Sequence, residues 1–380
     1  MTTKHRQIST ALRAEISSGR YPAGGRLPSE PQLAERFGVS RPTVARALLD
    51  LQTDGLIDRR TGSGTYVRAE GAAAATASST RQLGLLIPGL GQTEIFEHIC
   101  GDLASLARVQ GYGMLWGGSP HPGHDTDASL EHAEELCRHF IERKVSGVFF
   151  APYELDPDKA SANRRLAETL RQAGIPVVLL DSDFPSYPNR SDFDLVGVDN
   201  VAGGYIMAEH LIRLGCRHLY FVARPHSAPT VDARVAGVRQ ALARHRLEID
   251  PGWLQVGDPT DARFVRSLTA AGQADAFICH NDHTAALLLR SLEAVRIKVP
   301  RDVRVVGFDD AKYATLISPQ LTTIHQPCRD IAAIALRTML ERIADPALPA
   351  SSRSLTPRLV VRESCGAYLP RGRGTYSAVL

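Results

Sequence analysis

The spacing of hydrophobic positions changes along this chain and separates two kinds of structure. Within the first 55 residues, apolar side chains recur every three or four positions, and Ile8, Leu12 and Ile16 form the first such ladder. This spacing is typical of one face of a helix. From Gln82 onward, short continuous apolar runs alternate with helical patterns instead. The pattern therefore predicts a small, mainly helical segment followed by a larger α/β domain.

The small segment is predicted to contain two short helices joined by a tight turn. Ser29 followed by Gln32 has the spacing of a capping box, which favours a helix start, and Gly38 ends that helix. Ser40 can cap a second helix that extends over Arg41–Asp54. Two helices joined by a short glycine-containing turn form a helix-turn-helix.

A β-hairpin is predicted directly after these helices. Its strands are Leu56–Arg60 and Thr65–Arg68. The intervening residues, Thr61–Gly64, include two glycines and suit a turn that needs positive φ. The hairpin would lie beside the helix-turn-helix as a wing.

The polar side chains of this segment predict contacts with double-stranded DNA. The first residues of a recognition helix contact base edges in the major groove, and a wing tip can reach the backbone or the minor groove. A single arginine could instead be a solvated surface charge, as Arg46 would be if it paired with Asp50. The position of several polar and basic residues on one motif favours DNA binding. The candidates are Ser29, Ser40, Arg41, Thr43, Arg46, Arg59, Arg60, Gly62, Ser63, Gly64 and Thr65.

The segment resembles the winged helix-turn-helix of the GntR family of bacterial transcription regulators. The stretches that carry the resemblance are LPSE at 27–30, VSRPTVARAL at 39–48, GLI at 55–57 and GSGTYV at 62–67. The resemblance covers about residues 4–69 and implies sequence-specific DNA binding. Some family members have DNA-contacting arginines where this chain has Pro31 and Ala45, so those two contacts are not carried over.

Charge is distributed unevenly and supports this division. Residues 1–69 contain eleven Lys and Arg against six Asp and Glu, a net charge of +5, whereas the whole chain carries +3. The remainder is therefore slightly acidic. A basic segment attached to a nearly neutral domain is typical of a nucleic-acid-binding module.

Several other classes of protein are disfavoured by the sequence. The six cysteines form no CxxC pair and no zinc-finger spacing, so we expect buried thiols in a reducing compartment. The N-terminus lacks the apolar core of a signal peptide, and no run of about 20 apolar residues is long enough to span a membrane. We expect a cytoplasmic protein that has no membrane contact, no cofactor and no bound metal.

The predicted domain boundaries follow from these changes in composition. The DNA-binding domain would occupy residues 1–69 and the α/β domain residues 82–364, with a C-terminal tail at 365–380. Residues 70–81 are mostly small and are predicted to form a linker, with an alanine-rich helical spacer as the alternative.

The α/β domain is predicted to contain parallel sheets covered by helices on both faces. Ligands of such sheets bind beyond the carboxyl ends of the strands. Polar residues follow several predicted strands, and each could merely cap the next helix. Together with Arg234 at a helix start, they favour a polar pocket that could bind adjacent sugar hydroxyls. The strand-end residues are Asp181, Asp199, Asn200, His280, Asn281, Asp282, Asp309 and Asp310.

Residues 82 to about 364 resemble the effector-binding domain of the LacI/GalR family, which shares its fold with periplasmic sugar-binding proteins. The resemblance is carried by VGVDNVAGGYIMAEHLIRLGCRHLYFVA, RVAGVRQAL, AFICHNDHTAALLL, and VPRDVRVVGFDD followed by LTTIHQP. It implies two similar lobes joined by three crossovers, which we place near Gly215, at Thr323–Gln326 and at Ala350–Thr356.

The same resemblance implies which residues contact an effector. Cys328 occupies a position where family members often have an aromatic side chain that stacks on the sugar, so the identity of the ligand stays open. The implied effector-binding residues are Gln92, Glu94, Phe96, Asp199, Arg234, Asn281, Asp309 and Gln326.

The combination of these two domains resembles the arabinose-repressor type of bacterial regulator. They imply a homodimeric transcription repressor that binds a double-stranded DNA operator under the control of a small-molecule effector, expected to be a sugar. An activator, or a regulator that responds to a nucleobase, is the alternative. A transport-type binding protein would need a signal peptide and no DNA-binding segment. We expect no enzymatic activity and no catalytic residues.

Overall fold

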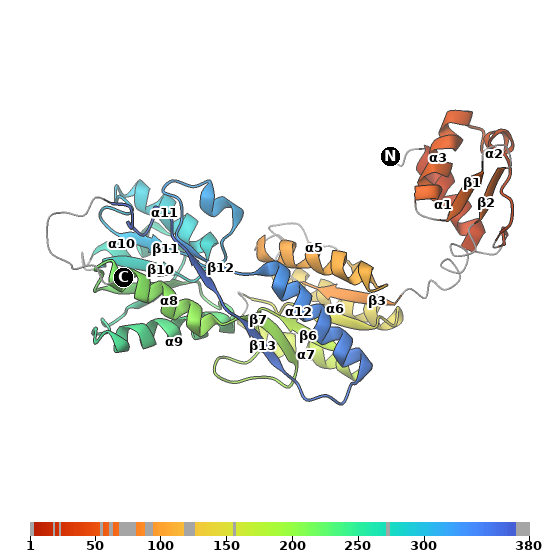
Figure 1. Cartoon of the computed structure of the whole chain (residues 1–380). Helices are drawn as coiled ribbons and strands as arrows, with labels where there is room; N and C mark the ends of the chain where they lie inside the picture. Colours follow the sequence, from red (N-terminus) through yellow and green to blue (C-terminus); the bar gives the residue numbers. More distant parts are fainter. Residues whose placement is uncertain are drawn as a thin grey trace. The chain divides into compact units, whose positions relative to one another are not determined.

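The computed structural model contains two compact units, Met1–Arg81 and Gln82–Leu380, which we call the head and the body (Figure 1). The predicted site residues Gly62, Ser63 and Gln92 lie outside the described residues, as do nearly all of the predicted linker and the chain beyond residue 369. The structure describes residues 4–17, 20–22, 24–53, 56–60, 64–67, 81–87, 94–117, 126–154, 157–270 and 274–369.

The head packs three helices against a two-stranded antiparallel sheet. Its elements are α1 (Lys4–Ser17), α2 (Glu30–Phe37), α3 (Arg41–Thr53), β1 (Ile57–Arg60) and β2 (Gly64–Val67). Ile8, Leu12 and Ile16 are buried in one core with Val44, Leu48 and Leu51. The predicted helical ladder is therefore the face of α1 that supports the helix-turn-helix.

Local capping explains why α2 begins and ends where the sequence predicts. The Oε1 atom of Gln32 accepts hydrogen bonds from the amide and the hydroxyl of Ser29, both at 2.8 Å. At the other end, Gly38 adopts a left-handed conformation with φ of 62°, which glycine reaches without steric cost. The hydroxyl of Ser40 then lies 2.8 Å from that of Thr43 at the start of α3.

The first lobe of the body is built on a six-stranded parallel sheet with strand order β13-β7-β6-β5-β3-β4. One core packs α5 and α12 against this sheet, and a second core packs α6 and α7. The strands are β3 (Gln82–Leu86), β4 (Gly113–Trp116), β5 (Gly147–Phe150), β6 (Val177–Leu180), β7 (Asp194–Val198) and β13 (Ser352–Leu355). The helices are α5 (Glu94–Val109), α6 (Thr126–Glu142), α7 (Lys159–Gln172) and α12 (Cys328–Ala344).

The second lobe is built on a four-stranded parallel sheet with strand order β11-β10-β8-β9. Its strands are β8 (Leu219–Ala223), β9 (Leu254–Val256), β10 (Ala276–Cys279) and β11 (Arg304–Val306). Its helices are α8 (Asn200–Arg213), α9 (Pro229–Arg244), α10 (Ala262–Ala270), α11 (Asp282–Ala294) and the short 3-10 helix η1 (Lys312–Thr315). An antiparallel pair, β12 (Thr323–His325) and β14 (Arg358–Val360), adjoins this lobe.

The chain passes between the lobes three times, and the structure corrects one predicted position. The crossings between β12 and α12 and between β13 and β14 lie at or beside the predicted places. The first crossing was predicted near Gly215, and this is wrong. Helix α8 already packs against α9 in the second lobe, so the chain crosses at the end of β7, at residues 198–200.

Four short strands of the body were not predicted as strands. They are β9, β12, β13 and β14, each of three or four residues. Most side chains of β9, β13 and β14 are exposed or half-buried, and β12 contains a single apolar residue, Ile324, so all four strands lack the continuous apolar run that marks β5 or β6. Within the described residues, no helix is both long enough and apolar enough to cross a membrane.

A buried carboxylate joins three elements of the first lobe. Asp194 at the start of β7 is 3% exposed and accepts a hydrogen bond from Nε of Arg342 at 2.9 Å. It also accepts bonds from the amide and hydroxyl of Ser351, at 2.8 and 2.9 Å, just before β13. These bonds fix the end of α12 and the entry of β13 beside β7 (Figure 1).

We expect Asp194→Ala to lower the free energy of unfolding of the protein by about 3–5 kcal/mol, because Arg342 would keep a largely buried charge without its partner. Urea denaturation followed by circular dichroism measures this loss. Asp192→Ala is the control, since Asp192 is 69% exposed in its pair with Arg171 and should contribute at most about 1 kcal/mol. Equal losses in the two variants would contradict this account.

Candidate functional site

The start of α3 presents polar and basic side chains on the surface of the head. Arg41 and Arg46 are exposed, and Thr43 is half-buried beside Ser40. Ser29 is also exposed at the start of α2. These positions suit contacts with a nucleic acid, and their role in DNA binding stays a prediction.

The hairpin β1–β2 brings further predicted residues together. Its register pairs Arg59 with Thr65 and Arg60 with Gly64, so both arginines are next to the turn. The side chains of Arg59 and Arg60 lie outside the described part of the chain. Gly64 has φ of 123°, and a Cβ there would lie 2.7 Å from Nε of Arg26. Arg26 is an exposed cation beside the wing that the sequence analysis did not select.

In the body, five polar side chains gather where the two lobes meet. Glu154 and Asp181 follow the adjacent parallel strands β5 and β6 of the first lobe, so they lie at the same edge of that sheet. In the second lobe, Asp309 lies after β11, Gln326 after β12, and Arg234 on α9. We call these five residues the interlobe cluster.

Arg234 is buried, and three contacts fix its guanidinium. Its Nε donates to Oδ1 of Asn200 at 2.8 Å, and its Nη1 donates to the carbonyl oxygen of His280. The guanidinium carbon also lies 3.6 Å from the centre of the Phe308 ring, which is a cation–π contact. The side chain is thus held in one orientation from three elements of the second lobe.

Two glycines make this arrangement possible. A Cβ on Gly204 of α8 would lie 2.0 Å from the carbonyl oxygen of Arg234, and a Cβ on Gly237 of α9 would lie 2.0 Å from that of Val201. Only residues without a side chain let the two helix backbones approach this closely. The close approach brings Asn200 within reach of Arg234.

The carboxyl groups of the cluster are perturbed by burial. Burial and, to a smaller extent, the nearby charge of Asp181 together raise the pKa of Glu154 to about 7, although Arg234 opposes the shift. Burial likewise raises the pKa of Asp309 to about 7, and it raises the pKa of Asp181. In each case the charge of Arg234 opposes the rise in pKa, so one guanidinium interacts electrostatically with three carboxyl groups.

Two acceptor atoms of the cluster have no hydrogen-bond partner among the described residues. Nε2 of Gln326 donates to Oδ1 of Asp309 at 2.8 Å, but its Oε1 is buried without a donor. Oδ1 of Asp181 is also buried without a donor. Buried polar atoms are normally satisfied, so these two oxygens indicate where a ligand can bind.

Two of the predicted effector residues make capping bonds. Oδ1 of Asp199 accepts from the amide of Ala202 at 2.9 Å, and Oδ1 of Asn281 accepts from the amide of Thr284 at 2.9 Å. The capping alternative therefore accounts for these bonds, and a further contact with an effector stays a prediction for both. Asp199 is exposed and does not join the interlobe cluster.

The predicted residues near the first strand have different surroundings. Phe96 is buried in the apolar core of the body. Glu94 reaches across to the other lobe, where its Oε2 accepts a hydrogen bond from the backbone amide of Lys312. Two further hydrogen bonds of this kind are donated by Nζ of Lys159 to the carbonyl oxygens of His226 and Ser227. We call these three hydrogen bonds the interlobe bonds.

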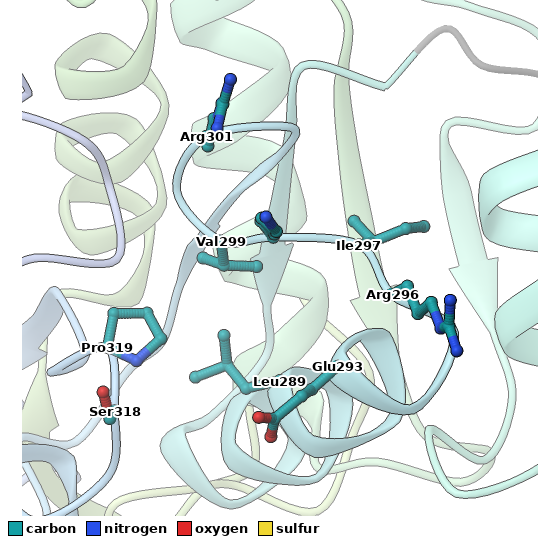
Figure 2. Close-up of a pocket in the computed structure, with 9 residues that line it drawn as sticks. Leu289, Glu293, Arg296, Ile297, Val299, Arg301, Ser318 and Pro319 are labelled. Carbon is teal, nitrogen blue, oxygen red and sulfur yellow. The ribbon is translucent and has the colours of Figure 1, made fainter.

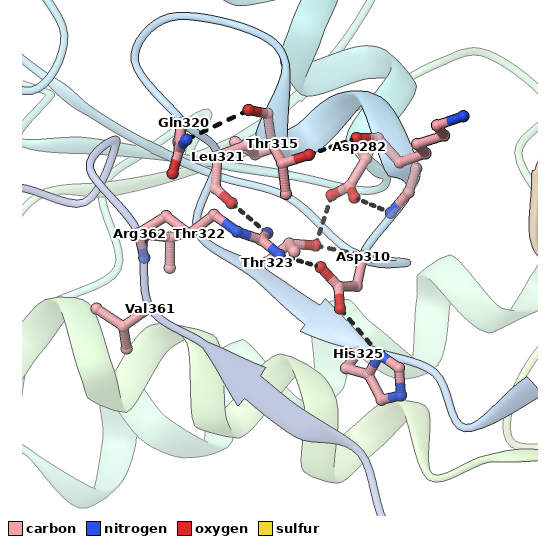
Figure 3. A network of polar contacts seen from close by, with 12 residues as sticks. Asp282, Asp310, Thr315, Gln320, Leu321, Thr322, Thr323, His325, Val361 and Arg362 are labelled. Carbon is pink, nitrogen blue, oxygen red and sulfur yellow. Dashed lines mark hydrogen bonds and ion pairs between the residues drawn. The ribbon is translucent and has the colours of Figure 1, made fainter.

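A polar network holds β12 in place close to the crossings (Figure 3). Asp310 accepts from Nη2 of Arg362 at 2.5 Å and lies 2.9 Å from Nδ1 of His325. Asp282 accepts from the hydroxyl of Thr323 at 2.5 Å and is fully buried. Asp282 thus follows a strand because it holds β12 in place. From the sequence alone, this supporting role cannot be distinguished from ligand binding.

A separate hollow of about 600 Å³ lies at the far end of α11 in the second lobe (Figure 2). Leu289, Ile297, Val299 and Pro319 supply apolar walls, and basic side chains such as Arg296 lie at its rim. None of the interlobe-cluster residues lines it. In the part of the chain that the structure describes, no cluster of His, Cys, Asp and Glu suits a metal ion.

Sequence reasoning missed Glu154 and the role of Asn200 as the partner of Arg234. Glu154 comes four residues after β5 rather than directly at its end, in the stretch APYELD. The usable signal was the end of the apolar run GVFF, since the carboxyl edge of any parallel strand is a candidate position.

Comparison with known proteins agrees with the two parts of the structure. Residues 4–67 match the bacterial regulatory proteins of the gntR family, and residues 208–365 match the periplasmic binding protein-like domain. Both resemblances predicted from the sequence are therefore confirmed.

Relatives are similar over most of the chain. The arabinose metabolism transcriptional repressor of Geobacillus stearothermophilus is 26% identical over 371 residues, which cover 95% of this chain and 97% of that protein. The transcriptional repressor PurR of Vibrio campbellii is 27% identical, over 87% of this chain and 97% of that protein. A solved complex of the transcriptional regulator CelR with cellobiose has a TM-score of 0.63 at 23% identity and covers 89% of this chain and all of that one. The chain thus joins a GntR-family helix-turn-helix domain to a periplasmic-binding-protein-like domain with the fold of LacI-type regulators.

Proposed function

We propose that this protein is a transcription repressor whose binding to operator DNA is controlled by a small polar effector, with sugars as the first candidates. The observation that carries the proposal is the joining of a winged helix-turn-helix to a two-lobed body with a polar cluster between its lobes. The names of the relatives support it, since they are repressors of arabinose metabolism and PurR-type repressors. The cellobiose complex of a structural neighbour supports a sugar.

In this proposal the head binds DNA through α3 and the wing. Arg41 and Thr43 at the start of α3 contact base edges in the major groove, and Arg46 follows one turn later. Ser29 and Ser40, at the starts of the two helices, are suited to phosphate contacts. The wing residues at 59–65 bind the backbone or the minor groove, and Arg26 adds a cation beside them.

The interlobe cluster is the proposed effector site. Arg234, Asp309 and Gln326 contact the ligand from the second lobe, with Asn281 nearby, and Asp181 contacts it from the first lobe. A ligand that bonds to both lobes favours their closed arrangement. Such differential affinity is the source of allosteric control, typically worth about 1–3 kcal/mol.

We further propose that the protein acts as a cytoplasmic homodimer. The edge strands β4 and β9 each carry exposed apolar side chains, with Trp116 at 46% and Val256 at 54% exposure. An open strand edge with apolar side chains favours pairing with another chain. Two heads in a symmetric dimer would bind a palindromic operator.

We expect Arg41→Ala to reduce discrimination between operator and unrelated DNA by about 1–3 kcal/mol, because a base contact is lost. Fluorescence anisotropy with DNA from upstream of the protein's own gene and with a scrambled duplex measures this difference. Arg20→Ala removes the same charge outside the proposed surface and serves as the control. An equal loss on both duplexes would identify Arg41 as a phosphate contact only.

We expect Arg234→Lys to abolish the response to effector while operator binding is retained, because lysine cannot replace the bonds to Asn200 and His280 together. The measurement is anisotropy of the operator complex titrated with a panel of sugars. Arg239→Lys, on the exposed face of the same helix, is the matched control. The functional proposal fails if no member of the panel changes operator binding by the unmodified protein.

We expect Val256→Asp to convert the dimer to a monomer, because a charge replaces an apolar contact in the proposed interface. Light scattering coupled to size-exclusion chromatography gives the mass directly. Val295→Asp alters another exposed valine of the second lobe, away from a strand edge, and should leave the dimer intact. Dimers in both variants would exclude β9 as the interface.

A further inference from the structure

Above about pH 7, where Glu154 and Asp309 lose their protons, the interlobe cluster contains more negative than positive charge. Glu154, Asp181 and Asp309 share one guanidinium, that of Arg234. The ammonium group of Lys159 is the next cation that Glu154 experiences, but it is bonded to the carbonyl oxygens of His226 and Ser227. A buried site with this balance has no spare positive charge for an anionic ligand.

The hydrogen-bonding atoms of the cluster that lack a partner also favour a ligand that donates hydrogen bonds over an anionic one. The unpartnered atoms Asp181 Oδ1 and Gln326 Oε1 are acceptors, and their side chains are 5% and 1% exposed. Arg234, the strongest donor, already spends two of its N–H groups on Asn200 and His280. Asp181 Oδ1 and Gln326 Oε1 therefore remain as two unsatisfied acceptors of the cluster, and a ligand that satisfies them must bring donors.

Glu154 is held at this site by the fold rather than by chance. Oδ1 of Asn163 on α7 accepts from the amide of Tyr153 at 2.8 Å, and its Nδ2 donates to the carbonyl oxygen of Tyr153 at 3.1 Å. Asn163 is itself buried, so these two hydrogen bonds fix the backbone next to Glu154. Glu154 itself is half-buried, so a ligand can reach it from solvent.

We propose that Glu154 determines the specificity of the effector site, and that the effector is a molecule rich in hydroxyl or amino groups that carries no phosphate or carboxylate. The inference rests on the proposed role of the interlobe cluster as the effector site. Above about pH 7, an anion would add a further negative charge beside three carboxyl groups in a largely buried site. Like charges placed together in this way cost several kcal/mol, which is on the order of 100-fold in affinity.

Arg234 does not by itself provide an anion site. Its guanidinium face is covered by Phe308, and two of its edges are bonded within the protein. A phosphate usually needs the two parallel bonds of a free guanidinium or several cations. The contacts of Arg234 suit a hydroxyl oxygen better than a charged oxyanion.

Isothermal titration calorimetry of the full-length protein at pH 8, above the pKa of Glu154 and of Asp309, tests the inference with matched ligands. The neutral arm contains arabinose, ribose, galactose and glucose, the amino arm contains galactosamine and glucosamine, and the anionic arm contains galacturonate, glucose 6-phosphate and ribose 5-phosphate. We expect a ligand from the neutral or amino arm to bind, and its anionic counterpart to bind on the order of 100-fold more weakly. Tighter binding of an amino sugar than of its parent identifies an ammonium donor, and the reverse identifies hydroxyl donors.

The variant Glu154→Gln separates the role of this residue from that of the whole site. This variant should bind the preferred ligand with unchanged affinity. The ratio of its affinities for the neutral and the anionic ligand should fall on the order of tenfold, because one like charge is removed. Glu131→Gln, on the exposed surface of α6, should leave the ratio unchanged. Thermal melting verifies that both variants fold.

Three outcomes would overturn the inference. An anionic ligand that binds more tightly than its neutral counterpart contradicts the proposed ligand class, and if it also releases operator DNA, the functional proposal survives alone. An unchanged ratio in Glu154→Gln contradicts the role of that residue. A panel without any bound ligand counts against both proposals, whereas a neutral ligand that binds without affecting operator DNA counts against the functional proposal only.

Discussion

Burial of one arginine among three carboxyl groups is the constraint on which the centre of the body depends. A charge in this position is tolerated only if its partners are placed accurately, because unpaired buried charges are costly. The close approach of α8 and α9 at Gly204 and Gly237 provides that placement for Arg234. The cluster is therefore a product of helix packing in one lobe and of strand order in the other.

The connections between the lobes relate this cluster to the rest of the body. Gln326 belongs both to the cluster and to the crossing between β12 and α12. The network of Asp310, His325 and Arg362 anchors β12 at the same place (Figure 3). A group bonded to Gln326 would thus contact one of the three connections between the lobes directly.

The sequence predicted those features that depend on neighbouring residues. Ser29, Gln32 and Gly38 define α2 through bonds within a few positions, and the apolar runs of β5 and β6 mark strands by themselves. The short strands β9 and β12–β14 carry no such signal, because pairing with distant segments stabilises them. The same limit applies to the site. Arg234 was selected from a motif, whereas Glu154 becomes relevant only once β5 pairs with β6.

Position along the chain also could not distinguish a helix cap from a residue of the interlobe cluster. Asp199 and Asp309 both follow strands, yet the first caps α8 and the second points to Gln326 in the cluster. The crossing near Gly215 was misplaced for a similar reason. A helix after a strand usually covers the same sheet, and α8 instead belongs to the other lobe.

The interlobe bonds bear on how a ligand would be released. Glu94 and Lys159 each join the first lobe to backbone atoms of the second, at separate points. If a ligand is enclosed between the lobes, as proposed, these bonds would have to break before it leaves. Its rate of release would then depend on Glu94 and Lys159, which bind backbone atoms rather than the ligand, so that rate could change without a change in what is recognised.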